Sequence, residues 1–351
     1  MNELGFAWID IGILLLKILV VIVVNLVILM IMEWAERRVS AFIQDRLGPN
    51  RVGPAGLFQA VADGIKFFFK EEVVPTGADK WLYTFAPLLV LVPALMTFAA
   101  IPFGTTLELF GRAEPLQIVD LNVGFLYIFA LVSLGVYGVV LGGWASNSKY
   151  PFLGGLRASA QMISYELALG MSVIGIVMIT GSLRLSTIVE YQNGLLLGFL
   201  PRWNVFLQPL AFITFLVAAF AETNRLPFDL AEAEPELVGG YHTEYSSMKF
   251  AMFFMGEYIA LITTSALLTT LFFGGWDFPW VDEKALGIWG VLLSIAAFAL
   301  KTGFFLFFFL WVRWTIPRFR FDQLMRIGWK VLIPLALLNI VLTGAGLLFV
   351  H

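Results

Sequence analysis

The sequence has no cysteine, and its 351 residues include only two histidines, His242 and His351. The absence of cysteine excludes disulfide bonds, thiolate-held iron–sulfur clusters and zinc sites built on thiolates. Two histidines are a poor basis for a haem or a metal site. The chain therefore has no candidate redox cofactor, and any electrons used near it must arrive from elsewhere.

Charged residues are also scarce. They make up 13% of the chain, whereas hydrophobic residues make up 60%; soluble domains are typically about 25% charged and about 45–50% apolar. Such a chain is expected to reside in a lipid bilayer, where its 34 Phe and 11 Trp would face acyl tails and the membrane interface. The net charge of −3 gives no indication of a nucleic-acid partner.

Eight apolar runs are candidate membrane spans, since a helix needs about 20 mainly apolar residues to cross a bilayer. They lie at about 11–32, 82–101, 123–143, 162–180, 206–221, 251–273, 289–312 and 328–350, and the fifth is short. The N-terminus has no cationic segment or cleavage site of a signal peptide, so the first run is expected to remain as a span. We predict an all-α polytopic membrane protein with a single domain, residues 1–351.

The distribution of lysine and arginine predicts the orientation of these spans. The loops after odd-numbered spans hold 15 of these residues, and the loops after even-numbered spans hold 4. The positive-inside rule therefore places the odd loops in the cytoplasm and both termini outside.

The loop after the first span, residues 33–81, contains a predicted amphipathic helix. Gln59, Asp63, Lys66 and Lys70 share one face of it, and Leu57, Val61, Ile65 and Phe68 share another. One interpretation is an interfacial helix that rests on lipid headgroups. Asp63 favours another, the wall of a polar cavity, because an acid is not needed to bind anionic lipid.

Three ionisable residues lie inside predicted spans. Glu166 and Glu257 are about one to two helical turns from the cytoplasmic edge, and Lys301 is about ten residues from it, too deep to reach the interface easily. Burying a charge in a bilayer is costly, so each is expected to face protein or water, to be neutral or to have a partner. The alternative is a packed structural role for the two acids.

The segment 221–245 is unusually acidic for a loop on the basic side. Its six carboxylates are Glu222, Asp229, Glu232, Glu234, Glu236 and Glu244, and its one cation is Arg225. Carboxylates held close together have raised and coupled pKa values, which suits proton transfer near neutral pH. A solvated acidic loop, binding a divalent cation, is the other interpretation. The basic, aromatic segment 313–330 has three interpretations. It could be an ordinary cytoplasmic anchor, it could bind a soluble partner, or its arginines could balance the charge of these acids.

Taken together, these segments resemble the H-type membrane subunit of bacterial NADH:quinone oxidoreductase (respiratory complex I), whose mitochondrial counterpart is membrane subunit 1. The matching strings are ERR (36–38), DRLGPNRVGPAGLFQAVADGIKFFFKEE (45–72), AETNRLPFDLAEAEPELVGGYHTEY (221–245), FFMGEY (253–258) and RWTIPRFRFDQLM (313–325). They run in order across nearly the whole chain.

The resemblance implies a role at the joint between the membrane and hydrophilic arms of that complex. Its members form most of a chamber for the substrate quinone, ubiquinone or menaquinone, while FMN and iron–sulfur clusters belong to partner subunits. By motif, the quinone-binding residues would be Glu36, Arg37, Arg46, Asp63, Arg225, Asp229, Phe253 and Met255. The proton-coupling residues would be Glu166, Glu222, Glu232, Glu234, Glu236, Glu244, Glu257 and Lys301.

The implied enzyme is therefore a proton-translocating oxidoreductase of the bacterial inner membrane, with no catalytic residue or metal in this chain. Three alternatives stay open. The chain could belong to a related energy-converting hydrogenase or to a dehydrogenase of the reduced deazaflavin coenzyme. It could be a stand-alone proton or cation transporter that uses the same buried acids. It could also be a purely structural membrane anchor.

Overall fold

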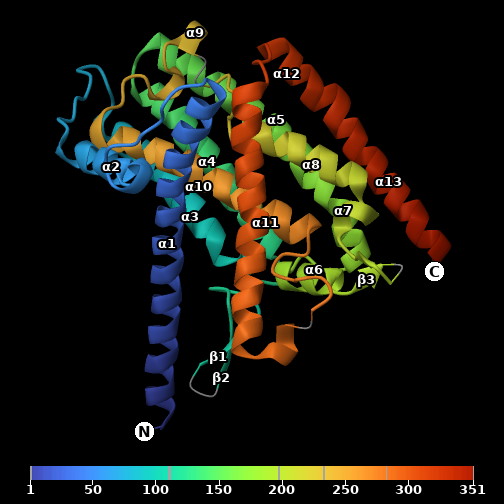
Figure 1. Cartoon of the computed structure of the whole chain (residues 1–351). Coiled ribbons are helices and arrows are strands. Elements are labelled where there is room, and N and C mark those ends of the chain that lie inside the picture. The colour runs from blue at the N-terminus through green and yellow to red at the C-terminus, as the bar shows by residue number, and fades with distance from the viewer. Residues whose placement is uncertain (1, 110–111, 197, 232–233, 282, 351) are drawn as a thin grey trace.

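The computed structural model describes residues 2–109, 112–196, 198–231, 234–281 and 283–350, and helices make up most of it (Figure 1). The long helices are α1 (Asn2–Ile43), α3 (Lys80–Met96), α4 (Gly124–Ala145), α5 (Lys149–Thr180), α10 (Ser247–Phe272), α11 (Ile288–Thr315) and α13 (Ile333–Val350). Shorter helices are α2 (Gln59–Phe69), α6 (Leu185–Gln192), α7 (Asn204–Leu207), α8 (Pro209–Glu222), α9 (Glu234–Leu237) and α12 (Phe321–Ile327).

Short helical turns and two hairpins complete the described elements. The turns are η1 (Pro54–Gly56), η2 (Thr97–Ala99), η3 (Gly240–His242), η4 (Glu283–Leu286) and the π-helical η5 (Gly328–Leu332). Strands β1 (Thr106–Leu109) and β2 (Arg112–Pro115) pair antiparallel, as do β3 (Leu195–Leu196) and β4 (Leu200–Pro201). These hairpins are not predictable from the sequence, because strands this short leave no clear alternation of polar and apolar residues.

Within the described residues, seven helices are long and apolar enough to cross a membrane. They correspond to seven of the eight predicted runs, so the prediction of a polytopic helical protein agrees with the structure. The exception is the run at 206–221, which forms α8 with only 14 residues. The break between α7 and α8 falls at Gln208, whose backbone is not helical, immediately before Pro209.

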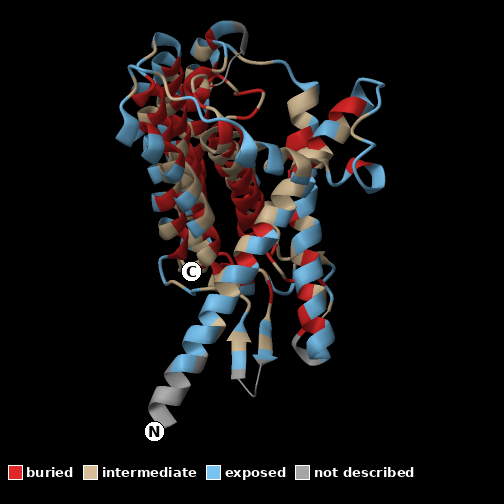
Figure 2. Ribbon diagram, turned by 90° about the vertical axis from the view of Figure 1, so that its left-hand side faces the viewer, coloured by how far each residue is buried: buried red, intermediate tan, exposed pale blue. Residues whose placement is uncertain are grey.

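The core of the bundle is built from α3, α4, α5, α8 and α10, which pack against one another. Helix α10 is the most buried of the candidate spans, whereas α1, α11 and α13 expose much of their apolar surface (Figure 2). Side chains of α10 from Leu261 to Phe272 are nearly all buried. Polar groups on α10 therefore face protein and not lipid.

A close approach between α5 and the loop before α10 depends on Gly154. A Cβ atom on this residue would lie 2.7 Å from the backbone nitrogen of Tyr241, so a larger residue would push the two segments apart. Gly240 of the same loop has φ +65°, a conformation that favours glycine. These two positions allow the 239–245 segment to pack directly on the helical core.

Candidate functional site

A buried ion cluster joins four segments that are distant in the sequence. Arg225 Nη1 donates to Glu36 Oε2 of α1 at 2.7 Å, and Arg225 Nε lies 2.5 Å from Glu257 Oε1 of α10. Arg313 Nη1 of α11 lies 2.6 Å from Glu36 Oε1. The hydroxyl of Tyr258 donates to Glu36 Oε2 at 2.7 Å, and its ring lies beneath the Arg225 guanidinium, 4.4 Å from its Cζ.

The geometry makes Arg225 the centre of this ion cluster. Its side chain is only 3% exposed. Burial by itself would lower the pKa of Arg225, but the nearby carboxylates of Glu257 and Glu36 raise it well above its ordinary value. Arg225 therefore stays cationic, and the two carboxylates that face it are the counter-charges that make its burial tolerable.

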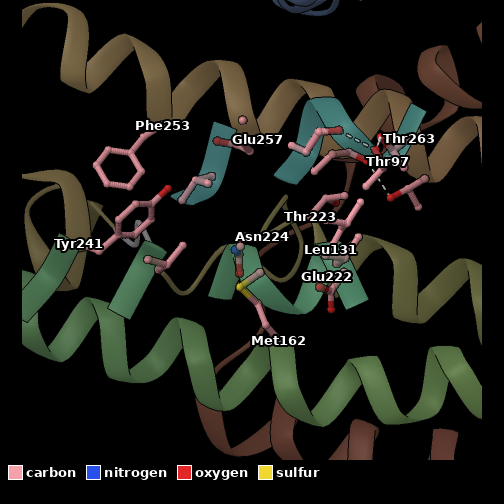
Figure 3. Close-up of a pocket in the computed structure, with 18 residues that line it drawn as sticks. Thr97, Leu131, Met162, Glu222, Thr223, Asn224, Tyr241, Phe253, Glu257 and Thr263 are labelled. Atoms are coloured by element: carbon pink, nitrogen blue, oxygen red, sulfur yellow. Dashed lines mark hydrogen bonds between the residues drawn. The ribbon is translucent and has the colours of Figure 1, made fainter. Parts of the chain in front are cut away.

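A small cavity connects this cluster with Glu222. The cavity has a volume of about 70 Å³, and its lining includes Glu257, Glu222, Asn224, Thr263 and Phe253 (Figure 3). Since one water needs about 10–15 Å³ measured in this way, the cavity has room for several. Glu257 and Glu222 thus share a polar space inside the bundle.

A second, smaller cavity continues from Glu222 to Glu166. It has a volume of about 20 Å³, and both acids line it together with Thr263 and Thr264. At its far side, Glu166 accepts a hydrogen bond from Ser133 of α4. The structure therefore brings Glu36, Glu257, Glu222 and Glu166 together in a row.

Glu222 differs from the other members of the row. It is 8% exposed, and neither of its carboxylate oxygens has a hydrogen-bond partner among the described residues. An unpaired carboxylate in such a position is costly unless it takes up a proton or binds water. It is the member of the row whose charge the protein does least to balance.

Aromatic side chains close one end of the larger cavity. Phe253 is fully buried and packs edge-on against Tyr241 and Tyr245, with ring centroids 5.2 and 4.8 Å apart. Tyr245 stacks on Tyr83 at 4.1 Å, and the Tyr83 hydroxyl donates to the backbone oxygen of Glu244 at 2.7 Å. The backbone of the acidic loop is thereby fixed on α3, beside the cavity.

A second ion cluster lies nearer the surface, where α1 meets α2. Arg37 bridges Glu33 and Asp63, with both nitrogen–oxygen distances 2.6 Å, and Lys66 lies 3.3 Å from Asp63. Partial burial would raise the pKa of Asp63, but the hydrogen bond and charge of Arg37 outweigh it and hold the pKa below its ordinary value. Asp63 of the polar face predicted for α2 thus contacts α1, while Ile65 and Phe68 of the apolar face are exposed.

The acids of the 221–245 segment do not form one cluster. Asp229 pairs with Arg318 at 2.8 Å, and Glu236 pairs with Arg157 at 2.6 Å. The backbone nitrogen of Phe319 donates to the Pro227 oxygen at 3.0 Å. Arg318 of the basic segment 313–330 therefore balances one of these acids, as in the third of the interpretations above, whereas Glu236 is balanced by Arg157 of α5. Glu232 and the side chain of Glu234 lie outside the described residues.

Three further predicted site residues lie apart from both the row of acids and the ion pairs described above. Arg46 lies between α1 and α11 in an outer groove, and Met255 lines neither cavity. Lys301 lies at the opposite end of α10. Its Nζ donates to the backbone oxygens of Phe273, Gly275 and Asp277 at 2.8, 3.1 and 2.6 Å. There it satisfies carbonyls at the C-terminal end of α10, which attracts cations.

The neighbourhood of Lys301 gives a pH-dependent prediction. Burial, and then the charge of Glu283, raise the pKa of Asp277 to about 6, although Lys301 opposes the shift. Because the folded state favours the protonated acid, ionised Asp277 destabilises the fold above pH 6, and this effect fades as the pH falls toward the ordinary aspartate value of about 3.9. We expect Asp277→Asn to raise the thermal unfolding temperature at pH values well above 6, with a smaller gain at lower pH.

A pH series of thermal unfolding on the purified protein measures this effect. Asp120→Asn is the matched control, because Asp120 is exposed and pairs with Arg184 at 3.4 Å. An equal gain for Asp277→Asn at all pH values would contradict the assignment.

Sequence reasoning missed Tyr258 and Arg313 as members of the buried cluster. Tyr258 stands next to Glu257 within the FFMGEY string, and Arg313 begins the basic segment after α11. Both residues thus stand in segments that the sequence had already singled out. Only the packing of α1, α10 and α11 shows that the side chains of Tyr258 and Arg313 reach Glu36. In the described part of the chain, no group of three or more metal-ligating side chains occurs.

Comparison with known proteins agrees with the motifs. The NADH dehydrogenase family matches residues 16–344. The H-type subunit of NADH-quinone oxidoreductase from Flavobacterium johnsoniae is 50% identical over 334 residues, which is 94% of each chain. One such subunit from Geobacter metallireducens is 54% identical, covering 95% of this chain and 96% of the relative. The counterpart from Thermomicrobium roseum is 55% identical over 89% of each chain. The resemblance predicted from the sequence is thus confirmed, and this chain belongs to the NADH dehydrogenase family.

Proposed function

We propose that this chain is the membrane subunit of a proton-translocating NADH:quinone oxidoreductase. In this proposal it forms much of the quinone-binding chamber and the first part of an acidic path from quinone chemistry to proton pumping. The observation that carries the proposal is the row from Glu36 through Arg225, Glu257 and Glu222 to Glu166. One cavity lies between Glu257 and Glu222, and a second lies between Glu222 and Glu166. The names of the curated relatives support the enzyme class.

The quinone side of the row is proposed to include the ion cluster at Arg225, the cluster at Arg37 and Asp63, and the aromatic wall at Phe253. Arg225 offers hydrogen-bond donors of the kind that a quinone oxygen needs. Asp229, through its pair with Arg318, would hold the loop that closes over this region. Arg46 and Met255 are left out, because neither residue lines the two cavities.

The coupling step is proposed to act through charge. Reduction of a quinone to a quinol takes up two protons, and in a region of low dielectric a local charge change acts on neighbouring acids more strongly than in water. Glu257 is held by Arg225, whereas Glu222 has no such partner among the described side chains. A proton moving between these two acids through water in the shared cavity would pass the change toward Glu166. Lys301 has no place in this path.

The placement in the membrane follows the same proposal. We infer eight crossings within one domain, with α7 and α8 together supplying the short fifth one, and an interfacial position for α2. The basic loops would lie in the cytoplasm and both termini on the periplasmic side of a bacterial inner membrane. Partner subunits of the membrane and hydrophilic arms would hold FMN and the iron–sulfur clusters.

Purification through an affinity tag on this chain tests the proposal. We expect the soluble subunits of an NADH:quinone oxidoreductase to co-purify, together with NADH:quinone activity that quinone-site inhibitors abolish. Co-purification with hydrogenase subunits would favour the related quinone-free complexes. Proton or cation transport by the purified chain alone in liposomes would favour a stand-alone transporter and contradict the proposal.

A further inference from the structure

A large apolar groove lies on the outer face of the bundle, between α1 and α11. It has a volume of about 700 Å³. Trp34 and Arg38 of α1 face Phe307 and Trp311 of α11 across it, and each pair is spaced four residues apart on one face of its helix. The turn that follows α1 brings Arg46 to the same groove. Figure 1 shows the upper ends of α1 and α11 side by side.

The two arginines of the groove are not balanced by acids. The Cζ atom of Arg38 lies 5.8 Å from the centroid of the Trp34 ring. The Nε atom of Arg46 donates a hydrogen bond to the amide oxygen of Gln44 at 2.6 Å. No ion pair of either arginine occurs among the described residues. This contrasts with Arg37, Arg225, Arg313 and Arg318, all of which face carboxylates. The groove therefore presents positive charge that is available to an anion.

The remaining lining is strongly apolar, and several of its large side chains are strongly exposed. Phe42 is 88% exposed and Leu47 is 83% exposed, and Phe307 and Trp311 are more than half exposed. Apolar surface of this extent is normally covered by lipid or by a partner. The tryptophans mark the depth at which acyl chains give way to headgroups, since indole rings favour that interface.

From this combination we propose that the groove binds an anionic phospholipid. Its phosphate lies between Arg38 and Arg46, and an acyl chain runs along Phe307 and Trp311 between the two helices. A free phosphate would leave the apolar floor unused. A neutral lipid would leave two cations without a counter-charge. An anionic phospholipid supplies both a counter-charge for the two arginines and an acyl chain to cover the apolar surface of the groove.

The groove is separate from the row of acids. It shares no lining residue with the cavities that hold Glu257, Glu222 and Glu166. Within α1, Glu36 and Arg37 point to the two ion clusters, whereas Trp34 and Arg38 line the groove. The site proposed here is therefore distinct from the quinone chamber, and its test does not depend on quinone turnover.

The experiment uses the assembled complex, purified in detergent through a tag on this chain and then incubated with dioleoyl phosphatidylglycerol. Lipid that stays bound after washing is counted by mass spectrometry. The double variant Arg38→Gln/Arg46→Gln is expected to lose roughly thirtyfold in affinity at one site, because each phosphate-facing cation contributes about fivefold. The matched control, Arg320→Gln/Arg326→Gln, removes two arginines from the same side of the bundle but outside the groove, and it should retain the lipid.

A second variant covers the case in which the double variant fails to assemble. Phe307→Glu places a negative charge on the floor of the groove and is expected to expel phosphatidylglycerol while both arginines remain. Equal retention of phosphatidylglycerol in wild type and Phe307→Glu would overturn the proposal. Equal retention of phosphatidylcholine and phosphatidylglycerol by the wild type would also overturn it. So would a structure of the complex in phosphatidylglycerol nanodiscs with a partner subunit filling the groove.

Discussion

Replacement of Arg225 by methionine is expected to abolish most NADH:quinone activity and to lower the amount of assembled complex. The change leaves the carboxylates of Glu36 and Glu257 facing each other in a buried site without the cation between them. Removing one partner of a buried ion pair destabilises a protein by about 3–5 kcal/mol. The measurements are native-gel quantification of the complex in membranes and quinone reductase activity per assembled complex.

The control and the rescue make this prediction specific. Arg320→Met removes an arginine that is 75% exposed, and it should have little effect on assembly. Adding Glu257→Gln to Arg225→Met leaves one cation, Arg313, facing one carboxylate, Glu36, and should restore part of the assembly without restoring full activity. Normal assembly of the Arg225→Met single variant would show that Arg225 is not needed to balance these acids.

The second large effect is expected from Glu222→Gln. Because neither oxygen of Glu222 has a protein partner among the described residues, the nearly isosteric amide should be accommodated and the complex should assemble. The amide is not expected to take up or release a proton, so the path between Glu257 and Glu166 would be interrupted. We expect proton pumping in membrane vesicles to slow by roughly tenfold or more, which corresponds to at least about 1.4 kcal/mol on the limiting barrier.

The informative quantity is the number of protons pumped per NADH oxidised, alongside the rate. Glu222→Asp is the conservative comparison, because it keeps a carboxyl group in the cavity and should retain part of the pumping. If Glu222→Gln pumps with near-normal stoichiometry and rate in an assembled complex, the row of acids is not the coupling path.

Hydropathy alone predicted most of the bundle. Seven apolar runs became long helices, since each carries about 20 residues that must avoid water. The run at 206–221 was harder to interpret, because Pro209 starts a new helix there and leaves α8 short. Helix α2 was predicted from its two-sided pattern, and its polar face does contact α1.

The depth of an acid in its predicted span indicated that an unbalanced charge there would be costly. It did not indicate which residues the acid contacts. A charge partner was one of the expectations for Glu257, and Arg225, in the loop after α8, provides it. Lys301 was expected to join the acids on the same reasoning. Lys301 lies instead at the far end of α10. The position of a residue along its helix does not indicate which neighbouring residues its side chain contacts. Tyr258 and Arg313 needed the packing of three helices to be recognised.

The buried cluster at Arg225 contains two guanidinium groups and two carboxylates, so it is electroneutral as a set. Any single protonation within it therefore leaves an excess positive charge that the four residues have no internal means to cancel. That excess can be relieved only by moving a charge elsewhere or by pulling the contributing segments apart. Uptake of one proton by this set would therefore act on α1, α10 and α11 together, because each of these helices contributes one of its charged residues.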